Sequence, residues 1–194
     1  MNSPSSSIPV FHHSTIPSVL IKNADIVNEG INRPADVLIR NGRIDRIDGT
    51  IDAQADIIID ANGKALLPGM IDCHVHFREP GLTHKGDMHS ESRAAAAGGV
   101  TSVMEMPNTR PPAVTNERLE EKFAIAAQKM AVNYSFYLGA ALNNLDEVKA
   151  VDPKNVCGVK VYMGSSTGDM LIDRFQTLED LFRECPINLT AHCE

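Results

Sequence analysis

The chain opens with short apolar, β-branched runs that predict a small β unit over residues 18–68. Two of the three runs contain Asn-Gly, the commonest signal for a tight hairpin turn, because both residues tolerate positive φ. The runs are VLIKNADIVN (19–28), DVLIRNGRIDRID (36–48) and DIIIDANGKALLPG (56–69). We therefore expect strands joined by hairpins in this part of the chain.

From Met70 onwards, strand-like runs alternate with helical ones. In chain order the segments are MIDCHVHF, HKGDMHSESRAAAAGG, VTSVMEMP, ERLEEKFAIAAQKM, NYSFYLGAA, NLDEVKAV, GVKVYM, RFQTLEDLFREC and INLTAHCE. This order predicts five parallel strands joined by four right-handed helical crossovers. We expect Gly98–Gly99 to end the first helix, and Asn116 is a candidate N-cap of the second.

A barrel explains this alternation better than an open doubly wound sheet. The open fold normally carries a Gly-rich phosphate turn after its first strand, whereas that position here holds histidines and an arginine. A (β/α)8 TIM-type barrel takes about 250 residues, so five strands ending at Glu194 amount to its first half. The expected organisation is a flexible leader at 1–17, the β unit at 18–68 and a truncated α/β barrel at 69–194.

Composition and charge narrow the class of protein. With 43% hydrophobic and 22% charged residues over 194 positions, the chain has the composition of a globular protein with a sizeable core. Its net charge of -7, without basic clusters, argues against a nucleic-acid partner. The four cysteines lack C-x-x-C spacing, which argues against a disulfide framework or a zinc knuckle. Because the sequence shows neither a membrane span nor a signal peptide, we expect a cytoplasmic protein without membrane association.

The densest chemistry lies in the segment DCHVHFREPG, at the end of the first barrel strand. Alternate side chains of a strand share a face, so His74, His76 and, if the strand geometry continues that far, Arg78 are expected to point together towards the barrel mouth, where barrel enzymes build their active sites. Two imidazoles then meet one metal ion. The plainer alternative is a strand with two structural histidines. A second pair, His12-His13, lies in the Ser- and Pro-rich leader without a third fixed ligand, so we expect no metal site there.

Strand counting places two further residues at the same mouth of the predicted barrel. Lys160 lies within the apolar fourth strand GVKVYM, and His192 lies near the end of the fifth, INLTAHCE. A buried lysine ammonium is unfavourable unless it reaches solvent or changes its charge. Reaction with carbon dioxide would convert it into an anionic carbamate able to bridge two zinc ions. The sequence leaves both interpretations of Lys160 open.

The string PGMIDCHVHFREPGLTHKGDMHSESRAAAAGGVTSVMEMPNTRPP closely resembles the dihydroorotases of the amidohydrolase superfamily, and GVKVYMGSSTG and AHCE continue the likeness. The resemblance spans residues 19–194. It implies that the first β unit is the N-terminal part of a small β-sandwich built around the barrel. It also implies zinc-dependent, reversible hydrolysis of dihydroorotate to N-carbamoyl-aspartate in pyrimidine biosynthesis.

The resemblance assigns a role to each of the rim residues. His74 and His76 would bind the more buried zinc, Lys160 as a carbamate would bridge two zinc ions, and His192 would help bind the second. In some members an aspartate a few residues further along the fourth strand takes the bridging place. Arg78 and Asn108 match the residues that hold the substrate carboxylate, which suits a planar guanidinium and an amide donor. The aspartate that acts as general acid and base is expected beyond Glu194, so the fragment alone should be inactive.

The remaining polar residues near these motifs have plainer expected roles. His84 and Asp87 precede a helix and are expected to cap it. His89 is expected at the surface, and Glu105 is expected to face the barrel in a packing or ligand-supporting role. The cysteines beside the ligands, Cys73 and Cys193, are expected in the core.

Two rival functions remain. An allantoinase or hydantoinase would share the metal ligands but act on another ring, and the pair that suits a carboxylate argues against it. A non-catalytic dihydropyrimidinase-related scaffold would have lost metal ligands that this chain retains. The expected partner is a small-molecule substrate. A homo-oligomer is expected, and association with an aspartate transcarbamoylase is left open.

Overall fold

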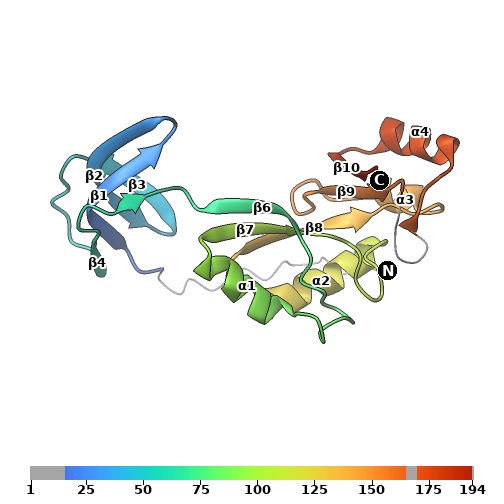
Figure 1. Cartoon of the computed structure of the whole chain (residues 1–194), viewed down its shortest axis with the longest axis horizontal. Helices are drawn as coiled ribbons and strands as arrows, with labels where there is room; N and C mark the ends of the chain where they lie inside the picture. Colours follow the sequence, from blue (N-terminus) through green and yellow to red (C-terminus); the bar gives the residue numbers. More distant parts are fainter. Residues whose placement is uncertain (1–15, 165–169, 194) are drawn as a thin grey trace, which may run out of the picture. The chain divides into compact units, whose positions relative to one another are not determined.

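The computed structural model describes residues 16–164 and 170–193, and it divides into two compact units between Pro68 and Gly69 (Figure 1). Most of the predicted leader, residues 1–15, lies outside the described residues, and the first strand begins at Val19.

The first unit is a five-stranded sheet. Its strands are β1 (Val19–Asn28), β2 (Ile31–Arg40), β3 (Arg43–Asp48), β4 (Ile57–Asp60) and β5 (Ala65–Leu66). The strand order is β3-β2-β1-β4, and β5 also pairs with β1. Strand β2 runs antiparallel to both β1 and β3, whereas β4 and β5 run parallel to β1. A small cluster of Leu20, Leu38 and Ile51 forms its buried core.

One of the two predicted Asn-Gly hairpins is present, and the other prediction was wrong. Asn41–Gly42, with φ of 52° and 71°, joins the antiparallel strands β2 and β3. Asn62–Gly63 also has positive φ, but it joins β4 to β5, which both pair with β1 and not with each other. The other hairpin turn is Glu29–Gly30, between β1 and β2. Positive φ thus marks a turn, while the strands' pairing partners decide whether it is a hairpin.

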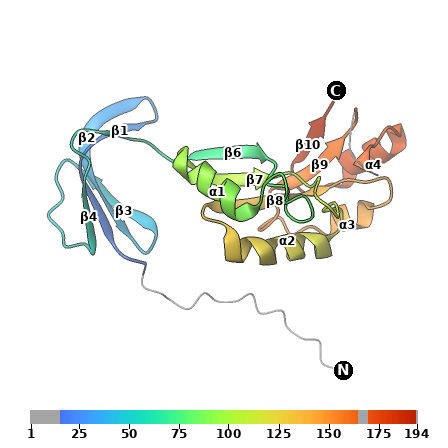
Figure 2. The ribbon, with the colours of Figure 1, turned by 60° about the horizontal axis from the view of Figure 1, so that its bottom comes forward.

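The second unit has the predicted alternation of five strands and four helices. The elements are β6 (Met70–Val75), α1 (Met88–Ala97), β7 (Val100–Glu105), α2 (Asn116–Lys129), β8 (Asn133–Gly139), α3 (Leu145–Lys149), β9 (Gly158–Tyr162), α4 (Phe175–Glu184) and β10 (Leu189–His192). The strands form one parallel sheet in the order β10-β9-β8-β7-β6. Sequential parallel strands with helical crossovers are the first half of a barrel, as predicted. Helices α1 and α2 lie side by side along one face of this sheet (Figure 2).

The core of this unit lies between the sheet and its helices. Alternate strand residues turn towards the helices, including Val103, Phe136, Leu138, Val159 and Val161, each at most 1% exposed. Leu119 and Ala126 of α2 join the same cluster. Period-two alternation therefore assigns the residues between them, Lys160 among them, to the opposite, barrel-interior face.

Helix ends follow local side-chain chemistry. Asp87 caps α1, and its side chain accepts the backbone N–H of Ser90 at 2.8 Å, which confirms its predicted capping role. Gly98 ends α1, also as predicted. The N-cap of α2 is Thr115, so the prediction of Asn116 was wrong by one residue. The Asn116 side chain instead donates to Glu147 of α3, at 2.7 Å.

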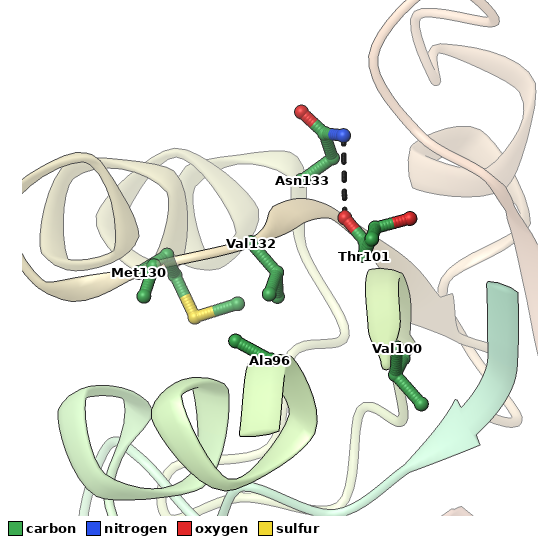
Figure 3. A pocket seen from close by; sticks show the side chains of 7 residues that line it. Ala96, Val100, Thr101, Met130, Val132 and Asn133 are labelled. Atoms are coloured by element: carbon green, nitrogen blue, oxygen red, sulfur yellow. Dashed lines mark hydrogen bonds between the residues drawn. The ribbon is translucent and has the colours of Figure 1, made fainter. Parts of the chain in front are cut away.

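A hollow of about 460 Å³ opens at the N-terminal ends of β7 and β8, the end of the strands opposite to the histidines (Figure 3). Its wall includes Ala96, Val100 and Met130, and Asn133 Nδ2 donates across it to the carbonyl oxygen of Thr101 at 3.2 Å. None of its seven lining residues is titratable. Hence this hollow offers no acid, base or strong metal ligand.

Across the described ranges, no helix combines the length and apolar character that crossing a membrane requires.

Candidate active site

Two histidines stand at the C-terminal end of β6, where the strand passes into a loop. His74 is exposed and His76 is half-buried, and their ring centroids are 5.2 Å apart. The backbone N–H of Met106, just after β7, donates to the carbonyl of Val75 at 3.0 Å. This bond holds the ends of β6 and β7 together, so the loop after β7 lies beside the two imidazoles.

Asn108, in the loop after β7, contacts the second histidine directly. Its Oδ1 lies 2.8 Å from Nδ1 of His76. Because an amide oxygen only accepts, Nδ1 carries the proton in this contact and Nε2 keeps its lone pair. A hydrogen bond of this kind orients an imidazole for a metal.

The surroundings keep His76 neutral. Burial lowers its pKa most, and the positive charge of Arg78 lowers it further, while the hydrogen bond with Asn108 acts in the opposite direction. His74 and Lys160 also lower the pKa of His76. Together these effects favour the neutral form of His76, which is the form that binds metals.

Lys160 is buried in the middle of β9, with 2% of its surface exposed. It pairs in register with Thr190 of β10 and Gly139 of β8. Its Nζ lies 5.3 Å from the centroid of the Tyr162 ring. Burial lowers the pKa of Lys160, with the nearby Cys193 acting in the opposite direction. A lowered pKa increases the fraction of neutral amine, the form that reacts with carbon dioxide.

His192 on β10 stands opposite Tyr162 in the β9–β10 register, and their ring centroids are 5.9 Å apart. Burial raises the pKa of Tyr162 to about 12, although Arg78 lowers it somewhat. Within the described part of the chain, the buried Tyr162 hydroxyl has no hydrogen-bond partner. Tyr162 was not singled out from the sequence. The signal was available, because it follows Lys160 by two residues and therefore shares its face of the strand.

Among the described residues of the candidate site, only Arg78 has an unusual backbone conformation. It is half-buried and has a φ of 69°, in a region that non-glycine residues rarely adopt. Strand geometry therefore ends before Arg78, and the loop conformation sets its direction. The positive charge of Arg78 lowers the pKa values of His76 and Tyr162.

The side chains that could bind a metal ion at this site are histidines and a lysine. In residues 16–164 and 170–193, no three His, Cys, Asp or Glu side chains are grouped so as to hold a metal ion. The structure instead offers two histidines at the end of β6, with ring centroids 5.2 Å apart, and a buried lysine in β9 of the same sheet. Such a set fits zinc if Lys160 contributes oxygen atoms as a carbamate, because imidazole nitrogen and carboxylate-type oxygen are ordinary zinc ligands.

Other predictions for this region had mixed outcomes. His84 and His89 are exposed, which confirms the surface position of His89. The cap of α1 is a capping box of Asp87 and Ser90, so the capping prediction was wrong for His84. Cys73 and Cys193 are exposed, so the core prediction was wrong for both. They lie in or beside β6 and β10, the two outer strands of the described sheet.

Glu105 also differs from its prediction. It shares a face of β7 with the buried Val103 and forms an ion pair with Lys122 of α2, with 2.7 Å between Oε2 and Nζ. The carboxylate therefore points towards the helix layer and not into the barrel.

Comparison with known proteins finds one matching family model and several similar relatives. Residues 63–153 match the family model described as Dihydro-orotase-like. The dihydroorotase of Methanosarcina acetivorans is 36% identical over 171 residues, which cover 87% of this chain and 36% of the relative. An L-hydantoinase of Paenarthrobacter aurescens is 34% identical over 154 residues, covering 78% of this chain and 34% of the relative. The solved L-hydantoinase from Arthrobacter aurescens aligns with a TM-score of 0.84 at 32% identity, covering 90% of this chain and 40% of that one.

The chain thus spans little more than a third of the length of these curated relatives. Within that span, the parallel sheet, the helical crossovers and the first sheet unit agree with the solved neighbour. Residues 63–153 of this chain are therefore dihydro-orotase-like, and most of the chain is similar to dihydroorotases and hydantoinases.

Proposed function

We propose that this chain is part of a zinc-dependent dihydroorotase, which interconverts dihydroorotate and N-carbamoyl-aspartate in pyrimidine biosynthesis. The observation that carries the proposal is the hydrogen bond between Asn108 and His76, with Arg78 two residues after that histidine in the chain. A cationic guanidinium and an amide donor next to a metal-binding histidine suit a cyclic amide that bears a carboxylate, and dihydroorotate is such a substrate.

In this proposal the two carboxylate-binding residues orient the ring. Asn108 uses Oδ1 for His76, which leaves its Nδ2 amide hydrogens for the substrate. Arg78 supplies the charge and the planar fork. Holding the carboxylate at two points fixes which ring carbonyl faces the histidines, and such positioning supplies much of an enzyme's rate acceleration.

His74, His76, Lys160 and His192 are the residues that would hold zinc. The chemistry that bound zinc supplies is polarisation of a carbonyl and a lowered pKa of water. For Lys160 we propose a carbamate: the neutral Nζ attacks carbon dioxide, one C–N bond forms and one proton leaves. The buried position of Lys160 supports this, because an unmodified ammonium there would be poorly solvated. The general acid and base is proposed to be an aspartate outside residues 1–194.

A hydantoinase is the second candidate, and the similarity to the solved L-hydantoinase favours it. Hydantoin itself carries no carboxylate, so the charge of Arg78 would have no counterpart on that ring. The two candidates therefore differ in what Arg78 does.

The deciding experiment uses a chain that continues residues 1–194 to the length of the curated relatives, which we call the extended chain. Loaded with zinc, it should hydrolyse dihydroorotate with a much higher kcat/KM than hydantoin or allantoin. Activity confined to hydantoin or allantoin would contradict the proposal. Metal analysis that finds no zinc would instead support a non-catalytic scaffold.

A further inference from the structure

Residues 79–81 follow Arg78 directly and join its loop to the loop that carries Asn108. The backbone N–H of Arg110 donates to the carbonyl oxygen of Pro80 at 3.1 Å. Arg110 lies two residues after Asn108 in the chain, and Pro80 lies two residues after Arg78. The two residues proposed to hold the substrate carboxylate therefore lie on loops that are hydrogen-bonded to each other.

Gly81 allows the two loops to approach closely. Its φ is 83°, in the left-handed region that glycine adopts without steric cost. A Cβ atom added at Gly81 would lie 1.9 Å from the carbonyl oxygen of Arg110 and 2.7 Å from the Arg110 Cβ. Because non-bonded carbon atoms pack at about 3.5–4.0 Å, any larger residue at position 81 would push the loops apart.

Glu79 anchors the same segment to the helix layer. It is buried, with 7% of its surface exposed. Its Oε2 accepts the backbone N–H of Met88, the first residue of α1, at 3.0 Å, and its Oε1 pairs with Lys129 at the end of α2. The N-terminus of a helix favours a carboxylate, and the lysine supplies the opposite charge. Both carboxylate oxygens are therefore satisfied, and the residue after Arg78 is fixed to two helices.

The backbone of Arg78 is held in an unusual conformation by its own loop. A φ of 69° is rare for a residue with a side chain, and such a conformation persists only when the surroundings fix it. The carbonyl oxygen of Arg78 accepts the N–H of Leu82 at 3.0 Å, which closes the loop around residues 79–81. The direction in which the Arg78 side chain leaves the backbone is therefore set by this loop.

The Asn108 loop has a separate anchor on the sheet. The backbone N–H of Gly139, the last residue of β8, donates to the carbonyl oxygen of Ala113 at 2.8 Å. A change at Gly81 should therefore displace the Arg78 loop more than it displaces Asn108.

We propose that Glu79 and Gly81 are positioning residues, which hold the Arg78 loop against the Asn108 loop so that guanidinium and amide meet the same carboxylate. Neither residue touches the substrate, and both act through Arg78. Holding two binding groups in a fixed arrangement lowers the cost of ordering them when the substrate arrives. This inference rests on the proposed function, in which Arg78 and Asn108 bind the carboxylate of dihydroorotate.

The first test is Gly81→Ala in the zinc-loaded extended chain, with Gly99→Ala as the matched control. Gly99 has a similar φ of 85°, but a Cβ atom there would meet only the side-chain tip of Met70, at 3.9 Å. Both variants therefore place alanine at positive φ, and only Gly81→Ala forces two loops apart.

We expect Gly81→Ala to raise KM for dihydroorotate about tenfold, equivalent to about 1.4 kcal/mol, with kcat and zinc content nearly unchanged. The kcat/KM for hydantoin, which lacks a carboxylate, should not change. The backbone N–H of Arg110 should exchange its hydrogen faster, because its acceptor at Pro80 moves away, and this measurement does not depend on activity. Gly99→Ala should lower the melting temperature and leave KM and the Arg110 exchange rate as they are.

A second variant, Glu79→Gln, tests the anchor without adding bulk. Glutamine keeps an oxygen acceptor for the N–H of Met88 but removes the charge that pairs with Lys129, and it should raise KM for dihydroorotate in the same direction. The control is Glu121→Gln on α2, whose carboxylate pairs with Arg118 at the surface and whose replacement should leave KM unchanged.

A lower melting temperature without any change in KM, in both Gly81→Ala and Glu79→Gln, would overturn the inference and leave the proposed function intact. Equal losses on dihydroorotate and hydantoin would also overturn it, because the effect would then not concern the carboxylate. Wild-type protein that is inactive on dihydroorotate would overturn the proposed function, and the inference with it.

Discussion

Replacing Asn108 separates its two roles, because its oxygen and its nitrogen serve different partners. In Asn108→Leu the Nδ1–H of half-buried His76 loses the acceptor that now lies 2.8 Å away. In Asn108→Asp the acceptor remains, but the amide donor is replaced by a negative charge. The first variant therefore tests support of the metal ligand, and the second tests substrate binding.

The expected changes in zinc affinity and in KM follow from these contacts. A buried polar group left unpaired costs about 1–3 kcal/mol, which corresponds to about 5- to 150-fold in an equilibrium constant. Loss of the group that orients a metal-binding histidine typically weakens metal affinity about 10- to 100-fold. We expect Asn108→Leu to weaken zinc binding within this range. We expect Asn108→Asp to keep zinc affinity and to raise KM for dihydroorotate at least about tenfold, because like charges repel.

The assay is zinc competition against a chelator of known affinity, followed by steady-state kinetics on the reloaded extended chain. Asn133→Leu is the matched control, because Asn133 lies at the opposite end of the strands and bonds only backbone and Ser102 there. Unchanged zinc affinity in Asn108→Leu would refute the argument that Asn108 orients His76 as a ligand. Unchanged KM in Asn108→Asp would refute its contact with the substrate carboxylate.

Three further predictions concern the carbamate and the two cores. Native mass spectrometry should find a carbon dioxide adduct on the zinc-loaded extended chain, and Lys160→Ala should lack it and bind less zinc; an unmodified wild-type lysine would contradict the carbamate. Phe136→Ala should lower the free energy of unfolding by about 3–5 kcal/mol, since Phe136 is 1% exposed and packs edge-on against Phe123; a loss below about 1 kcal/mol in urea titration would contradict the assigned core. The hydrogen bond from the backbone N–H of Ile51 lowers the pKa of buried Asp36 in the folded protein. Ionised Asp36 should therefore stabilise the fold fully at pH values above the ordinary pKa of aspartate. This stabilisation should be lost as the pH falls through the lowered pKa of the folded state. The stability difference between wild type and Asp36→Asn, about 1–3 kcal/mol at pH 7, should shrink below about pH 3.8; a difference independent of pH would exclude this linkage.

Periodicity in the sequence was enough to predict the parallel sheet and the side chains that share its inner face. The alternation that turns Val159 and Val161 towards the helices also leaves Lys160 on the other face, and this needs no knowledge of distant contacts. The capping role of Asp87 was equally local. Such features depend on residues within a few positions of one another.

The errors arose where a residue's environment depends on distant segments. The Asn62–Gly63 turn has hairpin-like φ values, yet β1 provides the pairing partner of both flanking strands. Cys73 alternates as a core residue would, but it lies on an edge strand. Glu105 was assigned to the barrel face from strand alternation alone. Its partner, Lys122, lies on α2, which begins 11 residues after Glu105, and strand alternation carries no information about that helix.

The hydrogen bond between Asn108 and His76 also has a thermodynamic consequence. One side chain holds a metal ligand with its oxygen and, in the proposed function, the substrate with its nitrogen. If substrate binding orders Asn108, it also orders His76, and zinc then binds to a histidine that is already oriented. Thermodynamic linkage makes this effect reciprocal. The factor by which bound zinc raises the affinity for the substrate carboxylate equals the factor by which the bound carboxylate raises the affinity for zinc. In the proposed function, metal affinity and substrate affinity are therefore coupled quantities, and each should be measured at a stated concentration of the other ligand.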